Sequence, residues 1–552
     1  MKAYELIADA VAAHDVDTVF ALLGDGNMFP LAALVEHHGV RLVNARHENA
    51  AVLMAEGWAR TTGRVGVASV TCGPGLTQVM TALTGAVRNR TPLVVLAGEV
   101  PQGTAWNPQR TDQGLLVAAT GARYLPVSTP ALLVAAVQEA FAVAERERAP
   151  AVVAVPYDLQ EREIEPPAGP VTRLPRIPPP PVAAPSPADV GAAAARLAAA
   201  RYPLVLAGRG AVASGAREAL LSLAERTGAL LGTTLYARDW FRGERFDAGL
   251  IGGLSSRTTR ELVAQAGLVL AVGAGLGYFA TDNGALFRGK EVIQVDVDPP
   301  GVSEGVRAAT SFVRGDAAAA VAAIDAELAA QGHVAIGFRT PETAARLASP
   351  LPEYPRVELE PGTVDPVAVM KMLDAALPED ALLVYGVGHF WSFAVMHLHR
   401  PRPEDHLHAY GFGAVGQGLG TAIGAAVGAG RPVVLVEGDG SLLMHAGELA
   451  TVAAERLNLL VLVMNDGGFG SEIHKLNAKG EDGELARFGR TDFAAVARGF
   501  GLAGHTLASP GELAALVAGT GPAVVDVPMS KLAISAPTRR ALFPDTIPAK
   551  ET

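Results

Sequence analysis

The sequence has few of the residues that would suit a secreted protein or a nucleic-acid-binding protein. Cys72 is the single cysteine among 552 residues. The chain therefore cannot form an internal disulfide framework, which favours a reducing compartment. Lysine and arginine together number 45 against 56 aspartates and glutamates, for a net charge of −11. This deficit of positive charge argues against a nucleic acid or an anionic membrane as a partner.

Long apolar stretches are also absent. No uncharged apolar run approaches the roughly 20 residues that a transmembrane helix needs. The first 19 residues are interrupted by acidic residues, Glu5 and Asp9 among them, so they do not read as a signal peptide. We therefore predict a cytoplasmic protein with no membrane partner.

What the sequence does contain predicts a large α/β protein. A chain of 552 residues is too long for one core and suggests roughly three domains. Two proline-rich passages, 165–187 and 349–366, are typical of semi-rigid connectors. They divide the chain into predicted domains 1–165, 186–345 and 356–552. Each alternates short Val/Leu/Ile runs with Ala-rich helical stretches, which predicts three doubly wound parallel sheets, the central one six-stranded.

The most informative stretch lies in the third domain. Gly438-Asp439-Gly440-Ser441 follows the apolar run 432–436, and Asn465-Asp466-Gly467-Gly468 follows a second run, 459–464. The apolar spacing between them predicts one amphipathic helix over 442–457. In a strand–helix–strand unit both carboxyl ends meet at one edge of the sheet. Two carboxylates beside glycine turns at that edge suit a Mg²⁺ ion that holds a diphosphate.

This stretch resembles the thiamin diphosphate motif of the acetolactate synthase and pyruvate decarboxylase superfamily, Gly-Asp-Gly followed by a paired-Asn site. The resemblance implies thiamin diphosphate as cofactor and a Mg²⁺ held by the Asp439 and Asp466 side chains and the Gly468 carbonyl. The family usually has Asn where this chain has Asp466, which adds negative charge but keeps an oxygen donor. An ordinary glycine turn after a buried strand is the alternative. The neighbouring cofactor contacts would be Gly438, Gly440, Ser441 and Phe469.

The first domain resembles the pyrimidine-binding domain of the same superfamily. The resemblance is carried by residues 43–60 and by Thr71-Cys72-Gly73-Pro74-Gly75, in which Gly73 would contact the cofactor. It implies that Glu48 touches a ring nitrogen of the aminopyrimidine and promotes loss of the C2 proton. The alternative for Glu48 is a solvated carboxylate in the first turn of a helix, where the helix dipole favours it.

Two further passages of the first domain resemble substrate-side elements. Gly24-Asp25-Gly26-Asn27 is similar to the Gly-Asp-Phe-Asn loop of pyruvate decarboxylases, whose Asp lines the substrate side of the cofactor; a simple turn explains the same letters. Gln109 corresponds to the active-site Gln of acetolactate synthases, and Gln113 is the alternative alignment. The tandem His of pyruvate decarboxylases is missing here.

Two loops of the third domain add cofactor contacts by resemblance. In residues 410–416, the Gly413 carbonyl would accept a hydrogen bond from the aminopyrimidine, and Val415 would hold the cofactor in its bent shape. The second loop, 386–392, follows an apolar run and is placed to meet the diphosphate. His389 is either a contact of that diphosphate or a packed loop histidine.

The segment after the metal motif departs from acetolactate synthase. Glu472 stands where pyruvate decarboxylases carry a catalytic Glu, and a helix starting near Gly470 would point it at the cofactor. His474 would offer charge to a substrate carboxylate or face solvent. Lys475 replaces a Trp that shapes acceptor choice in acetolactate synthases. A solvated turn is the alternative for the whole segment.

The central domain differs from the FAD-binding domain of acetolactate synthases. Their Gly-Ala-Arg-Phe-Asp-Asp-Arg passage corresponds here to residues 273–279, Gly-Ala-Gly-Leu-Gly-Tyr-Phe, and both arginines are gone. We therefore expect no tightly held FAD.

Together these features predict a thiamin diphosphate-dependent 2-oxo acid decarboxylase or carboligase, acetolactate synthase-like, acting on a small carbonyl substrate. The family implies a homodimer or homotetramer with active sites shared between chains. A 2-hydroxyacyl-CoA lyase or oxalyl-CoA decarboxylase-like enzyme is the alternative, although its basic patch would rest on the sparse Lys531, Arg539 and Arg540. A catalytically silent relative is disfavoured because Glu48 and Asp439 are both present.

Overall fold

The computed structural model describes residues 1–175, 184–299, 301–351, 359–519 and 521–543. Parts of both predicted connectors, at 176–183 and 352–358, lie outside the described residues. The chain forms two compact units. The first comprises Met1–Pro179, Leu359–His397 and Leu407–Ala533, and the second comprises Pro180–Glu358, Leu398–His406 and Ile534–Thr552. The first unit thus joins the N-terminal sheet and the C-terminal sheet in one body.

The N-terminal sheet has six parallel strands in the order β2-β1-β3-β4-β6-β5. Its strands β3, β4 and β6 are almost wholly buried, as parallel strands covered by helices on both faces must be. The strands are β1 (Thr18–Ala21), β2 (Arg41–Asn44), β3 (Gly66–Val70), β4 (Leu93–Glu99), β5 (Arg123–Pro126) and β6 (Pro150–Pro156), and the α-helices are α1 (Ala3–Ala12), α2 (Met28–His38), α3 (Glu48–Thr62), α4 (Pro74–Thr77), α5 (Met80–Asn89), α6 (Gln113–Thr120), α7 (Leu133–Glu147) and α8 (Tyr157–Gln160).

The central sheet is also six-stranded and parallel, with the order β12-β11-β10-β7-β8-β9. Helix α9 starts at Pro187, with Ser186 as its N-cap residue. The elements are β7 (Pro203–Ala207), β8 (Leu230–Thr233), β9 (Asp247–Leu250), β10 (Leu268–Val272), β11 (Glu291–Asp296), β12 (Ser311–Arg314), α9 (Pro187–Ala199), α10 (Arg209–Ala213), α11 (Arg217–Thr227), α12 (Arg257–Gln265), α13 (Tyr278–Thr281), α14 (Ala317–Ala330) and α15 (Pro341–Ala348).

The glycine turns of the central sheet pack against each other. A Cβ at Gly208, after β7, would lie 2.3 Å from the carbonyl oxygen of Gly273, after β10. Gly273 itself has a φ of +53°, which glycine adopts without strain. Close approach of the two turns is therefore enough to explain these glycines without a bound nucleotide.

The C-terminal sheet repeats the topology of the N-terminal one, with six parallel strands in the order β14-β13-β15-β16-β18-β17. The predicted fold class, three doubly wound parallel-sheet domains, is confirmed. The elements are β13 (Leu382–Tyr385), β14 (His406–His408), β15 (Val433–Gly438), β16 (Leu459–Asn465), β17 (Ala503–Thr506), β18 (Ala523–Pro528), α16 (Pro366–Ala376), α17 (Trp391–His397), α18 (Gly418–Ala429), α19 (Asp439–Met444), α20 (Leu449–Ala454), α21 (Gly470–Ala478), α22 (Phe493–Gly499) and α23 (Leu513–Val517). The last helix, α24 (Ala536–Leu542), belongs to the second unit.

The prediction of one helix over 442–457 is wrong. The segment begins its helix at Asp439, leaves helical geometry at His445 (φ −133°, ψ 25°), makes a short 3-10 turn over Ala446–Glu448 and resumes as α20. Apolar spacing alone could not reveal the break, because the apolar positions on both sides still face the sheet.

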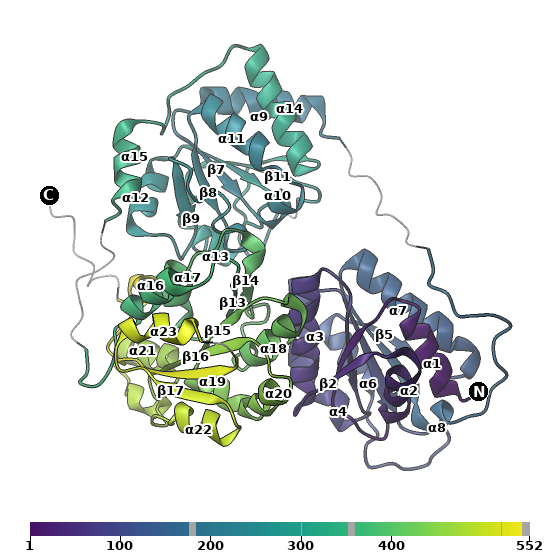
Figure 1. Cartoon of the computed structure of the whole chain (residues 1–552). Helices are drawn as coiled ribbons and strands as arrows, with labels where there is room; N and C mark the ends of the chain where they lie inside the picture. Colours follow the sequence, from purple (N-terminus) through teal and green to yellow (C-terminus); the bar gives the residue numbers. More distant parts are fainter. Residues whose placement is uncertain (176–183, 300, 352–358, 520, 544–552) are drawn as a thin grey trace. The chain divides into compact units, whose positions relative to one another are not determined.

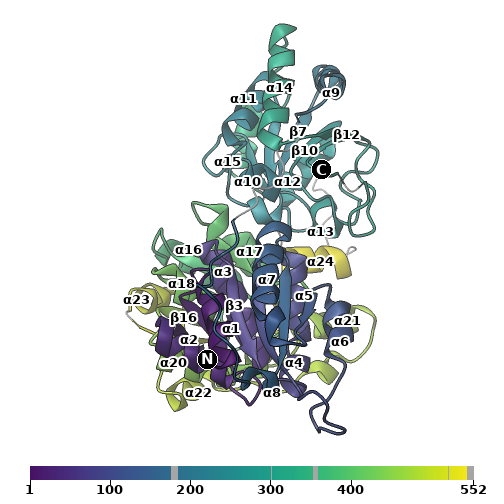
Figure 2. The same cartoon turned by 90° about the vertical axis from the view of Figure 1, so that its right-hand side faces the viewer.

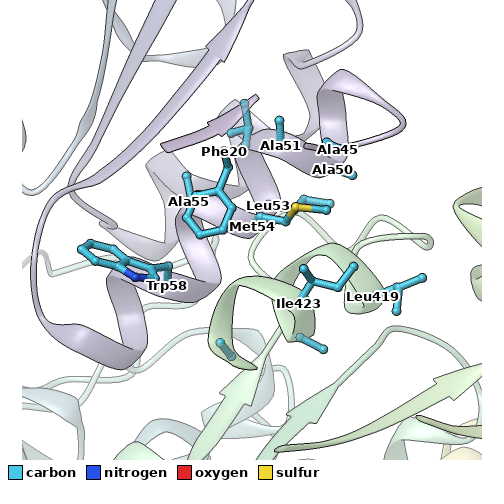
Figure 3. Packing of buried hydrophobic residues seen from close by; sticks show 14 of the residues in the cluster. Phe20, Ala45, Ala50, Ala51, Leu53, Met54, Ala55, Trp58, Leu419 and Ile423 are labelled. Atoms are coloured by element: carbon cyan, nitrogen blue, oxygen red, sulfur yellow. The ribbon is translucent and has the colours of Figure 1, made fainter. Parts of the chain in front are cut away.

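Helices α3 and α18 join the N- and C-terminal sheets, and they lie side by side in both views (Figure 1 and Figure 2). Trp58, Leu53 and Met54 of α3 and Leu419 and Ile423 of α18 belong to one buried cluster (Figure 3). Two glycines permit the close contact. A Cβ at Gly57 would lie 2.0 Å from the Thr421 carbonyl oxygen, and one at Gly424 would lie 1.8 Å from that of Met54.

No helix within the described ranges is both long enough and apolar enough to cross a bilayer.

Candidate active site

A pocket opens at the carboxyl edge of the C-terminal sheet, where β13, β15 and β16 are neighbours. Three loops, one after each strand, therefore converge there, as expected for ligand sites of open α/β sheets. Ten of the residues predicted from the sequence line the pocket: His389, Val415, Gly438, Asp439, Gly440, Ser441, Asp466, Gly468, Phe469 and Glu472.

Two buried carboxylates form the centre of the pocket. Asp439 and Asp466 are 3% and 4% exposed, too little for water alone to stabilise two negative charges. Asp439 accepts hydrogen bonds from the backbone N–H groups of Gly440 and Gly467, each at 2.8 Å. Burial, together with the nearby charge of Asp466, raises the pKa of Asp439 to about 7.

This arrangement suits a divalent cation. A cation between the two carboxylates would relieve their repulsion and favour the ionised form of Asp439. Within the described residues, no group of three or more His, Cys, Asp or Glu side chains converges as a metal cage. Two carboxylates with a backbone carbonyl from Gly468 match a Mg²⁺ that takes its other ligands from a diphosphate and water.

A hydrogen bond joins the 410–416 loop to helix α19, which follows strand β15. The Gly416 N–H donates to Ser441 Oγ at 2.7 Å, which brings Val415 into the lining. Gly413 (φ +71°) and Gly416 (φ +84°) have the left-handed backbone that favours glycine. Gly413 is not among the lining residues; it lies on the same loop, two residues before Val415.

His389 is buried in the pocket, and neither of its ring nitrogens has a hydrogen-bond partner. Its Nδ1 lies 3.8 Å from Asp466 Oδ2. The His389 ring packs edge-on against the buried His474 ring, with centroids 4.5 Å apart. A buried imidazole without partners is costly unless a ligand supplies them. His389 therefore fits a diphosphate contact, while His474 is not among the lining residues.

Glu472 lies at the pocket but is not enclosed by it. Helix α21 begins at Gly470, and Glu472 in its first turn lines the pocket. Its side chain is 54% exposed and lies 3.2 Å from the Lys475 ammonium, which is also exposed. Glu472 thus has access both to the pocket and to solvent.

The remaining predicted residues gather at the equivalent edge of the N-terminal sheet. Asp25 follows β1, Glu48 opens α3 after β2, and Gly73 follows β3, and these three strands are neighbours. Glu48 is partly buried, and its Oε1 lies 3.6 Å from where a Cβ on Gly75 would be. Gly73 has a φ of +55°, and a Cβ there would lie 2.1 Å from the Gln109 carbonyl oxygen. Asp25 is exposed.

The two glutamines that alignment left open occupy different environments. Gln113 is buried, with its amide bonded to the Gly73 N–H at 2.8 Å and to the Gly98 carbonyl at 3.0 Å. Gln109 is only partly buried and accepts from the Cys72 thiol at 3.1 Å. Gln113 therefore supports the loop, whereas the Gln109 side chain is the more accessible of the two.

We call the pocket and the group of residues at the edge of the N-terminal sheet the two half-sites; the residues that line the pocket all come from 387–529, and none belongs to the N-terminal sheet.

Sequence reasoning missed two buried acids near the motif. Glu437 is fully buried, and burial raises its pKa to about 7. The sequence signal for Glu437 was its place as a charged residue directly after the apolar run 432–436. Glu448 is 1% exposed and contacts the loop before Glu48. No sequence signal marked Glu448, because it lies three residues after the helix break at His445, which the sequence did not predict.

Comparison with known proteins gives matches along most of the chain. Three models of thiamine pyrophosphate enzymes match it: the N-terminal TPP-binding domain over 1–116, the central domain over 190–324 and the C-terminal TPP-binding domain over 386–527. A probable 2-ketoarginine decarboxylase from Pseudomonas aeruginosa is 32% identical, covering 85% of this chain and 83% of the relative. An acetolactate synthase large subunit from Parasynechococcus marenigrum is 30% identical, covering 94% and 86%. A sulfoacetaldehyde acetyltransferase from Rhodobacter capsulatus is 29% identical, covering 82% and 80%.

Proposed function

Because the chain belongs to the thiamine pyrophosphate enzymes, we propose that it decarboxylates a 2-oxo acid and passes the product to a proton or to a second carbonyl compound. The observation that carries this proposal is the carboxylate pair Asp439 and Asp466, buried beside glycine turns at the edge of the C-terminal sheet. Relatives named as decarboxylases and acetolactate synthases support the reaction type.

The proposed roles follow from the chemistry of each group. Bound thiamin diphosphate would supply the electron sink for the bond that breaks beside the carbonyl. Asp439, Asp466 and the Gly468 carbonyl would hold Mg²⁺, and His389 and Ser441, which line the same pocket, would contact the diphosphate. The Val415 side chain and the Gly413 carbonyl would orient the aminopyrimidine. Glu48 would exchange a proton with the aminopyrimidine nitrogen, and Glu472, Asp25 and Gln109 would serve the substrate side. His474 is buried and does not line the pocket, so it is given no role there.

We propose that each active site is shared by two chains. Glu48 and the Asp439 pocket lie at the edges of different sheets, and the pocket lining of the described chain includes no residue of the N-terminal sheet. Two copies related by a twofold axis would each supply one edge to the other. A homodimer or a dimer of dimers meets this requirement.

The central domain is proposed to hold no tight flavin. Its glycine turns are explained by their contact with each other, and 273–279 carries no arginine. An absorbance spectrum of the purified protein with a stoichiometric flavin band would contradict this.

Substrate turnover tests the proposed function. The protein, with Mg²⁺ and thiamin diphosphate, is given pyruvate or a guanidino 2-oxo acid, the latter because one relative is named for 2-ketoarginine. Released CO₂ is measured, and products are scored as aldehyde, acetoin or acetolactate. We expect CO₂ from at least one 2-oxo acid. Cleavage of a 2-hydroxyacyl-CoA without CO₂ from any 2-oxo acid would favour the CoA alternative instead.

The CoA alternative has little structural support. Lys531 lies 3.2 Å from Glu484 Oε1, and Arg540 donates to the carbonyls of Gly253 and Ser255. These side chains are engaged within the protein and do not form a basic patch for a CoA phosphate.

A further inference from the structure

A buried carboxylate of the C-terminal sheet region contacts the loop that carries Glu48. Glu448, 1% exposed, accepts a hydrogen bond from the Arg46 backbone N–H through Oε1 at 2.8 Å. Its Oε2 lies 2.9 Å from the hydroxyl of Thr451, which lies 3.1 Å from the carbonyl oxygen of Asn44. Glu448 thus holds the Arg46 N–H, and the single proton of the Thr451 hydroxyl is shared between Glu448 and the Asn44 carbonyl; both residues lie about 400 positions away in the chain.

The backbone of this segment leads directly into Glu48. His47 is the N-cap of α3 in extended geometry (φ −147°, ψ 139°), and its Nδ1 accepts from the Asn49 N–H at 3.1 Å. The His47 ring also packs edge-on against His445, with centroids 5.0 Å apart. Because the direction of a Cα–Cβ bond follows from the backbone, fixing Arg46 and His47 fixes where the Glu48 side chain starts.

The helix break described above belongs to the same contact. His445, where the chain leaves helical geometry, and the following 3-10 turn Ala446–Glu448 are the residues that meet the loop before Glu48. Because of this break, the segment contacts the loop before Glu48 in addition to packing on the sheet.

We propose that Glu448 is a positioning residue for Glu48. Its carboxylate, assisted by Thr451, holds the backbone of Asn44 to His47 so that the Glu48 carboxyl meets the aminopyrimidine nitrogen at hydrogen-bonding distance. The proposal rests on the proposed function, in which Glu48 exchanges a proton with the bound cofactor. Displacement of an acid–base group by about 1 Å is sufficient to cost on the order of 10²-fold in rate.

A second contact between the same parts of the chain supplies a matched control. Arg41, at the start of β2, forms an ion pair with Glu455, just after α20. This pair joins the same two regions without touching the segment 44–48. A general loss of interdomain contact would appear in Glu455→Gln as well, whereas a loss of positioning would not.

The test measures how fast the C2 proton of bound thiamin diphosphate exchanges with deuterated solvent, in holoenzyme with Mg²⁺. We expect Glu48→Gln to slow exchange by about 10²–10⁴ and Glu448→Ala to slow it by about 10². Cofactor affinity, measured by calorimetry, should change by less than about threefold in Glu448→Ala, and Glu455→Gln should exchange at the parent rate. In the Glu48→Gln background, Glu448→Ala should add no further loss, because residues that act as one unit are not additive.

A second readout needs no cofactor. Amide hydrogen exchange of the apoprotein should become faster at Arg46 and His47 in Glu448→Ala, and not in Glu455→Gln. If Glu448→Ala does not fold, Thr451→Val keeps the side-chain shape, removes the Asn44 contact and should slow C2 exchange several-fold. Glu448→Gln keeps an acceptor oxygen and should recover most of the parent rate.

The outcomes separate the two proposals. Parent-rate exchange in Glu48→Gln would overturn the role of Glu48 itself. Slow exchange in Glu48→Gln, with parent rates in Glu448→Ala or in Thr451→Val, would overturn the positioning role alone. An equal further loss from Glu448→Ala in the Glu48→Gln background would do the same.

Discussion

The carboxyl groups of Asp439 and Asp466 repel each other across a buried pocket, and this repulsion distinguishes the two residues from ordinary turn aspartates. Burial and the charge of Asp466 raise the pKa of Asp439 to about 7. A protein tolerates such a site when a ligand compensates for it. The same two charges destabilise the metal-free protein and favour metal binding. Both effects can be measured in one set of unfolding experiments.

We predict that Asp439→Asn does not destabilise the metal-free protein but weakens its stabilisation by Mg²⁺ and thiamin diphosphate. Without metal, the variant should unfold at a temperature equal to or above the parent, because one buried like charge is gone while an acceptor oxygen remains. With Mg²⁺ and thiamin diphosphate, it should lose most of the ligand-induced rise in melting temperature, because the ion loses a carboxylate. Thermal unfolding with and without both ligands checks this.

Asp466→Asn is the matched control for that experiment. It restores the residue that the family usually has at this position and also removes a charge. It should keep most of the ligand-induced rise in melting temperature. Equal losses in both variants would show that charge alone, and not the position of Asp439, governs metal binding.

The packing of helices and turns determines where these residues lie. This packing is tight at two glycines, Gly57 and Gly424. Helix α3 carries Glu48 at its start and lies against α18, which follows the Val415 loop. The contact places backbone against backbone at Gly57 and Gly424. A rigid helix pair therefore connects the two sheet edges that hold the candidate site residues.

We predict that Gly424→Ala destabilises the protein by about 1–3 kcal/mol, as overpacking in a core does. The reason is that the added Cβ would lie 1.8 Å from the Met54 carbonyl oxygen. Urea denaturation measures the change. Gly85→Ala in α5 is the control: nothing lies within 4 Å of its added Cβ, so it should be neutral or stabilise by up to about 1 kcal/mol. Equal effects would contradict the close contact of α3 and α18.

The turn between α1 and β1 carries a histidine that should make stability depend on pH. The His14 ring stacks on Phe141 of α7 at 4.0 Å, and burial lowers its pKa to about 4, assisted by the charge of Arg173. Between pH 6.5 and 4 the unfolded chain binds a proton at His14 that the folded chain does not, so stability falls as the pH drops through this range.

We predict that His14→Phe, which keeps a ring against Phe141, removes this part of the pH dependence. Relative to the parent, the variant should gain about 1–2 kcal/mol between pH 7.5 and pH 5. Urea denaturation at the two pH values gives the difference. Parallel stability curves for parent and variant would show that His14 titrates alike in both states.

At the scale of the whole molecule, the proposed sharing of each active site by two chains can be tested. The pocket residues of the described chain come from 387–529, and Glu48 lies at the edge of another sheet. If two chains share each site, a chain with a defective Glu48 and a chain with a defective Asp439 can together build one intact site.

We predict that co-expressing Glu48→Gln with Asp439→Ala restores activity. Random pairing in a twofold dimer makes half of the dimers mixed, each with one intact site, for about a quarter of the parent activity. Each variant alone should stay near background. Turnover of the 2-oxo acid found active for the parent is the measurement. Absence of recovery in dimers shown to be mixed would contradict sharing.

The sequence by itself determined the family, the cofactor and the three-sheet fold. The fold follows from the alternation of strand-like with helix-like stretches, whereas the family and the cofactor follow from the resemblance of motifs such as Gly438-Asp439-Gly440 to those of thiamin diphosphate enzymes. Such signals depend on residues close in the chain. Ten of the residues that the sequence singled out line one pocket, and all but Val415 lie at or after the carboxyl ends of the three neighbouring strands β13, β15 and β16.

Only the tertiary structure decided which polar groups lose their water and meet each other. It separated Gln109 from the supporting Gln113, buried His389 without partners and left Glu472 half exposed. It also broke the expected helix at His445 and brought Glu448 to the backbone of Arg46. These facts depend on contacts between residues up to about 400 positions apart, and the free energy of burying a charge depends on that full environment rather than on the residue's neighbours in the chain.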